Sequence, residues 1–112
     1  MTNIQRLQLE IKGVNLQQTD LSIYLQENDL QPHNEYNATS NTSKRNIYKT
    51  ALSILESIAN NPSSMKNYKE DDLSVSQFAE NVQSRIDQLE RKIRTMKNDD
   101  DVEGNFFMLF NS

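Results

Sequence analysis

A regular stripe of apolar residues between positions 75 and 96 is the feature that most constrains how this chain can fold. Its members follow one another at intervals of four and three residues, the heptad spacing of a helix that packs one face against another helix. The pattern predicts a helix that runs to about Lys97. We expect its packing seam to consist of Val75, Val82, Ile86, Leu89, Ile93 and Met96, with Ala79 on the same face.

The start of this helix is marked by Ser74 and Gln77, which match the S-x-x-Q capping box. In such a box the N-cap serine accepts a hydrogen bond from the third helical N–H, and the glutamine side chain accepts one from the N-cap N–H. Leu73 and Phe78 stand at the spacing of a hydrophobic staple, which fixes the direction from which the chain approaches a helix. The helix is therefore predicted to begin directly after Ser74.

A second amphipathic helix precedes it, with Thr42 or Ser43 as the expected cap and Asn60-Asn61-Pro62 as the expected end. Its apolar residues recur at the spacing of a core-facing helix: Ile47, Ala51, Ile54, Leu55 and Ile58. We predict that the two helices pack antiparallel within one chain. An intermolecular coiled coil through the same seam is the alternative.

The N-terminal part is less regular. Residues 1–14 fit either a helix ending at Gly13 or an alternating strand, and we favour the helix. Thr19 or Asp20 is expected to cap a further short helix, closed by Pro32. Its expected buried face is Leu21, Tyr24 and Leu25, and residues 31–42 and 63–73 are expected to be a polar loop and a linker, the linker holding Met65 and Tyr68.

Composition supports an all-α fold. A chain of 112 residues makes one domain, and only two glycines and two prolines argue against an all-β fold with its many turns. Hydrophobic residues make up only 35%, which fits either a small bundle that completes its burial against neighbouring molecules or a chain with unstructured parts. We predict a bundle of three to four helices over residues 1–97, followed by an acidic linker and an extended hydrophobic C-terminal arm over residues 98–112.

No catalytic or metal site is indicated. The one histidine, His33, lies in a polar loop with no neighbouring base or nucleophile motif, and the chain has no cysteine. Asp71-Asp72 and Asp99 to Asp101 are adjacent aspartates, which lack the alternating spacing of a calcium loop. We expect no enzymatic activity and no cofactor, and no apolar run is long enough to span a membrane.

The last residues differ chemically from the rest. Four acids between Asp99 and Glu103 account for the net charge of −4, so the remaining body is neutral. A hydrophobic cluster follows Gly104, and we expect it to be an arm that docks on another subunit; folding back on the bundle is the alternative. The expected docking residues are Phe106, Phe107, Met108, Leu109 and Phe110.

The basic stretch from Arg85 to Lys97 is expected to be a solvated face rather than a nucleic-acid surface.

Residues 48–94 resemble the small head–tail connector, or adaptor, proteins of tailed bacteriophages. The resemblance rests on YKTALSILESIANNP at 48–62, on D-L-S-V at 72–75 before the last helix, and on R-I-D-Q-L at 85–89. That family has no catalytic residues to carry over.

The resemblance implies a virion subunit assembled in the host cytoplasm as a ring of its own copies beneath the portal. Such a ring contacts the portal protein and the tail or neck proteins, while DNA passes nearby without specific binding. Two other functions stay open: a non-virion scaffolding or regulatory protein that dimerises through the seam, and a small nucleic-acid-binding module.

Overall fold

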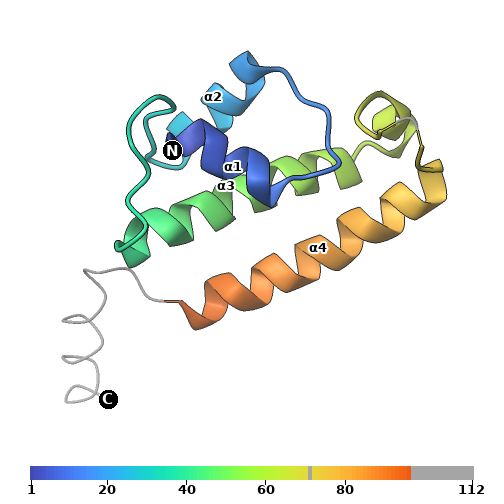
Figure 1. Ribbon diagram of the computed structural model, residues 1–112. Helices are drawn as coiled ribbons and strands as arrows, with labels where there is room; N and C mark the ends of the chain where they lie inside the picture. The colour runs from blue at the N-terminus through green and yellow to red at the C-terminus, as the bar shows by residue number, and fades with distance from the viewer. Residues whose placement is uncertain (71, 97–112) are drawn as a thin grey trace.

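Helix α3 (Asn41–Ala59) forms the centre of the fold, with shorter helices on one side and one long helix on the other (Figure 1). The computed structural model describes residues 1–70 and 72–96. These residues form α1 (Asn3–Glu10), α2 (Gln18–Glu27), α3, the 3-10 helix η1 (Pro62–Asn67) and α4 (Val75–Thr95). Within these ranges there is no β-strand beyond two isolated bridges, so the predicted all-α fold is confirmed.

Helices α3 and α4 pack antiparallel, and α1 and α2 lie across the opposite side of α3 (Figure 1). All five residues predicted for the apolar face of α3 are buried. Thr50 is buried with them, and its hydroxyl is satisfied because it donates to the backbone oxygen of Asn46 at 2.7 Å. The helix stops at Ala59, directly before the predicted Asn60-Asn61-Pro62 terminator.

The buried face of α4 differs from the predicted seam at its first position. Val82, Ile86 and Leu89 are buried against the core and Ile93 and Met96 are half-buried, but Val75 is 43% exposed. Phe78 is the first buried residue instead. The spacing of Phe78, Val82, Ile86 and Leu89 is four, four and three, which follows the 3.6-residue turn of a straight helix rather than a 3.5-residue heptad.

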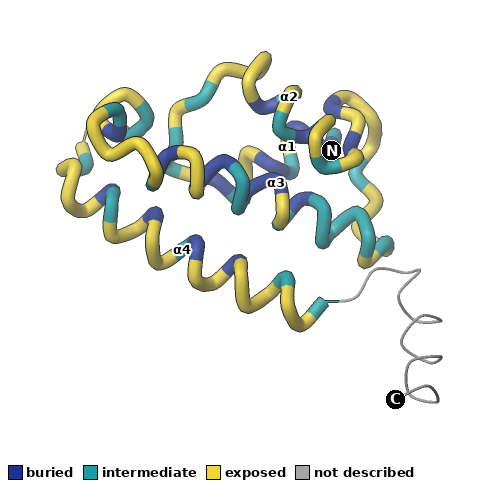
Figure 2. The backbone as a smooth tube through the Cα atoms, turned by 180° about the vertical axis from the view of Figure 1, so that it is seen from behind, coloured by how far each residue is buried: buried dark blue, intermediate teal, exposed yellow. Residues whose placement is uncertain are grey.

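The other faces of α4 are exposed along its length, as the colouring of Figure 2 shows.

The capping box that starts α4 is present as predicted. Gln77 N–H donates to the Ser74 hydroxyl at 3.1 Å, and Ser74 N–H donates to the Gln77 side-chain oxygen at 3.3 Å. The helix ends at Thr95, and Met96 is already extended.

The first fourteen residues form a helix, not a strand. Ile4, Leu7 and Ile11 are buried, whereas Leu9, which a strand would place on their side, is 47% exposed. The helix ends at Glu10 rather than running up to Gly13. Gly13 has a φ of 91°, a left-handed conformation that glycine adopts without strain, and it turns the chain toward α2.

Helix α2 begins and ends earlier than predicted. Its N-cap is Gln17, without a side-chain hydrogen bond, rather than Thr19 or Asp20. Leu21 and Leu25 are buried and Tyr24 is half-buried.

A Schellman motif, not Pro32, ends α2 at Glu27. Leu30 N–H donates to the Leu25 oxygen at 3.0 Å, and Asp29 N–H donates to the Gln26 oxygen at 3.3 Å. Asp29 takes the left-handed position with a φ of 64°, a place that glycine usually fills. The buried side chain of Leu30 supplies the hydrophobic contact that accompanies such a motif.

Two further boundaries differ from the prediction. Ser40, rather than Thr42 or Ser43, caps α3, because its hydroxyl accepts from Ser43 N–H at 3.1 Å. The predicted linker contains η1, whose Pro62 stands in the first turn and whose Met65 is buried. The linker thus contributes to the core.

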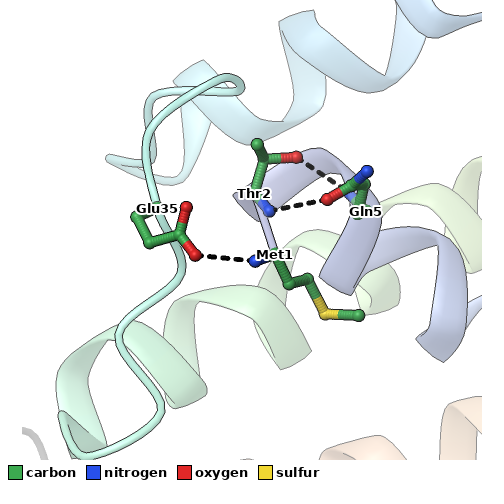
Figure 3. A network of polar contacts seen from close by, with 4 residues as sticks. All are labelled: Met1, Thr2, Gln5 and Glu35. Carbon is green, nitrogen blue, oxygen red and sulfur yellow. Dashed lines mark hydrogen bonds and ion pairs between the residues drawn. The ribbon is translucent and has the colours of Figure 1, made fainter.

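The loop after α2 runs along the start of α1 (Figure 3). Backbone N–H groups of Asn3 and Ile4 donate to the oxygens of Asn34 and Pro32, both at 3.0 Å. These two donors lie in the first turn of α1, where a helix offers them no internal partner. The Met1 amino group also contacts the Glu35 carboxylate at 2.6 Å, and Thr2 and Gln5 form a capping box. The loop therefore fixes where α1 lies.

Alanine substitutions at two valines of α4 distinguish the observed buried face of the helix from the predicted heptad seam. Val82→Ala should cost about 2–3 kcal/mol of unfolding free energy, because it removes buried methyl groups and leaves a cavity. Val75→Ala should stay within about 0.5 kcal/mol, as exposed positions usually do. Urea unfolding followed by circular dichroism measures both, and equal losses would contradict the described face.

Loss of the cap is a second test of the fold. Ser74→Ala should cost about 0.5–2 kcal/mol, because an N–H at the start of α4 loses its acceptor. Ser84→Ala, on an exposed position of the same helix, serves as the control. A thermal midpoint unchanged by Ser74→Ala would show that the hydroxyl does not hold the helix start.

Candidate functional site

An open pocket with a volume of about 320 Å³ lies between the end of α1, the C-terminal part of α3 and the first half of α4. Its volume is at the lower end of the roughly 300–1,000 Å³ found for ligand sites. Its walls are mainly apolar, since they are formed by Leu9, Ile11, Val14, Leu55, Phe78 and Val82. Such a pocket can receive one or two apolar side chains.

The polar part of the pocket lining carries two cations and one carboxylate. Glu10, Lys12, Asn81 and Arg85 contribute to it, and Lys12 and Asn81 are exposed. Glu10 is the one carboxylate among these lining residues, and it is paired with arginine on both sides. A negatively charged partner segment would therefore find a favourable surface beside the pocket.

Glu10 pairs with two arginines, Arg6 of the same helix and Arg85 of α4, and the second pair joins α1 to α4. Arg6 contacts one Glu10 oxygen at 2.7 Å, and Arg85 donates to the other oxygen from across the fold. The side chains of Arg6, Glu10 and Arg85 are only 16%, 11% and 28% exposed. Arg85 also donates to the Gln88 side-chain oxygen at 3.1 Å, which holds its guanidinium in place. We call these three charged residues the Glu10 cluster.

Two tyrosines extend the cluster toward the start of α3. The Arg6 guanidinium lies 5.4 Å from the ring centre of Tyr36 and 5.9 Å from that of Tyr48. The Lys92 ammonium of α4 lies 5.0 Å from the same Tyr48 ring. These cation–π contacts connect the loop, α1, α3 and α4.

The Glu10 cluster keeps Arg6 charged. Burial opposes the charge on the guanidinium, but the hydrogen bond to Glu10 and the attraction of its carboxylate raise the pKa of Arg6 above its ordinary value. Arg6 thus stays a cation at every pH at which the protein is used.

The structure places the middle of the predicted seam inside the fold, whereas Val75 at its start is exposed. Val82, Ile86 and Leu89 are already covered, and α3 is the helix that packs along α4. The predicted arm, Phe106, Phe107, Met108, Leu109 and Phe110, lies outside the described residues. His33 is exposed in its loop, and the described residues contain no group of three acidic or histidine side chains that could hold a metal.

Sequence reasoning missed the Glu10 cluster and the pocket. Lys92 is exposed, as predicted for a solvated face, although its ammonium lies over Tyr48. Arg85 departs from that prediction, because it is half-buried against Glu10. The spacing of Arg6 and Glu10, four residues apart on one helix, was the available local signal. Nothing local pointed to Arg85, which lies 75 residues from Glu10.

The chain belongs to a family of unknown function, DUF6706, whose model matches residues 1–103. The matched segment includes every described helix and the acidic run after α4, and it ends before Phe106. No curated protein and no solved structure shows significant similarity to the chain. Among the described helices, none has both the length and the apolar character needed to cross a bilayer.

Removing the shared carboxylate tests the Glu10 cluster. Glu10→Gln should cost about 1–3 kcal/mol of unfolding free energy, because two partly buried guanidinium groups lose their charged acceptor. Glu90→Gln removes an exposed carboxylate from α4 and should change stability by less than about 0.5 kcal/mol. Denaturant unfolding compares the two variants, and a Glu10→Gln loss no larger than the control would show that the contacts are not stabilising.

Proposed function

We propose that this chain is a structural subunit of a phage-type virion, a head–tail connector that forms a ring between the portal vertex and the tail. The observation that carries the proposal is the resemblance of residues 48–94 to such connectors. Those residues correspond to most of α3, to η1 and to nearly all of α4, so the resemblance covers one continuous packing unit. In this proposal the partners are copies of the chain, the portal protein and tail or neck proteins.

The exposed surface of α4 supports an assembly role. The helix buries one narrow face on α3 and leaves its remaining faces in solvent over 21 residues (Figure 2). A helix attached in this way offers a long surface to neighbouring subunits without unfolding the core. A pocket with apolar walls beside it provides a second contact site.

The two competing functions receive less support from the geometry. Dimerisation through the seam would require α4 to leave α3, because Val82, Ile86 and Leu89 are already buried. A nucleic-acid surface would use the basic residues of α4, but Arg85 and Lys92 make contacts within the chain. The body is neutral overall, so its net charge does not point to a phosphate-binding surface.

The proposal is tested on particles made by the genome that encodes this chain. Mass spectrometry of gradient-purified particles should detect the chain in a copy number comparable to that of the portal protein. Antibody labelling in electron micrographs should mark the single vertex that joins the tail. A wash at about 1 M salt removes charge-driven contaminants and serves as the control.

Other outcomes would contradict the connector. A chain that is missing from washed particles and forms a stable dimer in solution would be a regulatory or scaffolding protein. A chain whose affinity for DNA falls steeply with salt would be a nucleic-acid-binding module.

A further inference from the structure

We infer that the pocket beside α4 receives the aromatic C-terminal segment, Phe106 to Phe110, of a neighbouring copy of this chain. This inference rests on the proposed ring of connector subunits and identifies the contact between its members.

The pocket and the segment have matching apolar surfaces. The pocket walls are aliphatic and aromatic, and Leu9 at their edge remains 47% exposed. The segment holds three of the four phenylalanines in the chain together with Met108 and Leu109. Aromatic side chains that enter such a pocket supply much of the binding energy of an interface.

The charges beside the pocket and the segment are also complementary. Lys12, Arg85 and the nearby Arg6 are cations, and Glu10 is the carboxylate that partly neutralises them. The residues just before the aromatic segment carry four acids, from Asp99 to Glu103. When the phenylalanines occupy the pocket, this acidic run lies close to the basic edge, which favours the correct partner and orientation.

The length of residues 97–105 allows the aromatic segment to reach a pocket. It also bears on whether the segment comes from the same copy or from a neighbouring one. The described chain leaves α4 at Met96, about 21 Å along the helix from Val82 at the pocket. Nine residues, 97–105, separate Met96 from the aromatic segment and can span at most about 30 Å. For the aromatic segment to reach the pocket of the same copy, residues 97–105 would have to run back beside α4 for most of their extended length.

A contact between neighbouring copies can build the proposed ring, whereas a contact within one copy cannot. An arm of one subunit that enters a pocket on the next is a heterologous contact, since the two surfaces differ. Heterologous contacts repeat from copy to copy and close into rings when the rotation allows. The inferred contact is therefore of the type that a connector ring requires.

Cysteine cross-linking of the full-length purified protein tests the inference, because the native chain has no cysteine. One preparation carries Asn81→Cys at the pocket, and an isotope-labelled preparation carries Phe107→Cys. The two are mixed at high concentration in a glutathione redox buffer, and the mixed dimer is identified by its mass. Gln83→Cys, exposed on the side of α4 turned away from Asn81 and outside the pocket lining, replaces Asn81→Cys in the control.

We expect roughly tenfold more mixed dimer with Asn81→Cys than with Gln83→Cys, because a disulfide needs Cα atoms within about 7 Å and Cβ atoms that do not point apart. Adding Lys12→Glu to the Asn81→Cys chain should lower that yield severalfold, whereas Lys49→Glu on α3 should not. Both lysines are exposed, so neither change disturbs the core.

Equal yields from the two cysteine positions would overturn the inference. It would also be overturned if a chain carrying both Asn81→Cys and Phe107→Cys closed only within itself at every concentration, because the pocket would then hold its own segment. These measurements use purified protein alone. Their failure is thus distinct from absence of the chain from particles, which would refute the connector function.

Discussion

The rest of the structure depends on the two-sided burial of α3. This helix is the one described element against which α1, α2, η1 and α4 all pack, so it must supply a broad buried face. Ile47, Ala51, Ile54, Leu55 and Ile58 provide that surface, and Thr50 satisfies its hydroxyl within the helix. A small chain with 35% hydrophobic residues can build one core only if its helices share a common centre.

The central position of α3 separates α1 from α4, and the Glu10 cluster reconnects them. The long side chain of Arg85 reaches the Glu10 carboxylate that Arg6 holds from the other side. This arrangement costs desolvation, so its value lies in fixing the position of α4 as much as in stability. Glu10 and Arg85 also line the pocket, and the contacts that position the helices therefore shape the pocket as well.

The helices and most of their faces followed from periodicity, because burial on one side of a helix leaves a local pattern. The capping box at Ser74 followed for the same reason, since all its atoms lie within one turn. The end of α2 did not, because Asp29 occupies a left-handed position where the sequence offers no glycine. The Glu10 cluster and the pocket were also missed, because they form only when residues far apart in the chain meet at the surface of α3.

The pocket is well suited to an arm because its walls are held in place before a partner arrives. Arg85 is fixed by Glu10 and Gln88, Gly13 fixes the turn that carries Val14, and the wall residues Ile11, Leu55, Phe78 and Val82 belong to the core. Ordering such side chains on binding would otherwise cost about 0.5–1.5 kcal/mol each. With this cost already met in folding, a neighbour's segment loses only its own freedom when it binds. A weak contact of this kind, repeated around a ring, gains strength from every closed interface, so assembly does not require each pair of subunits to be stable alone.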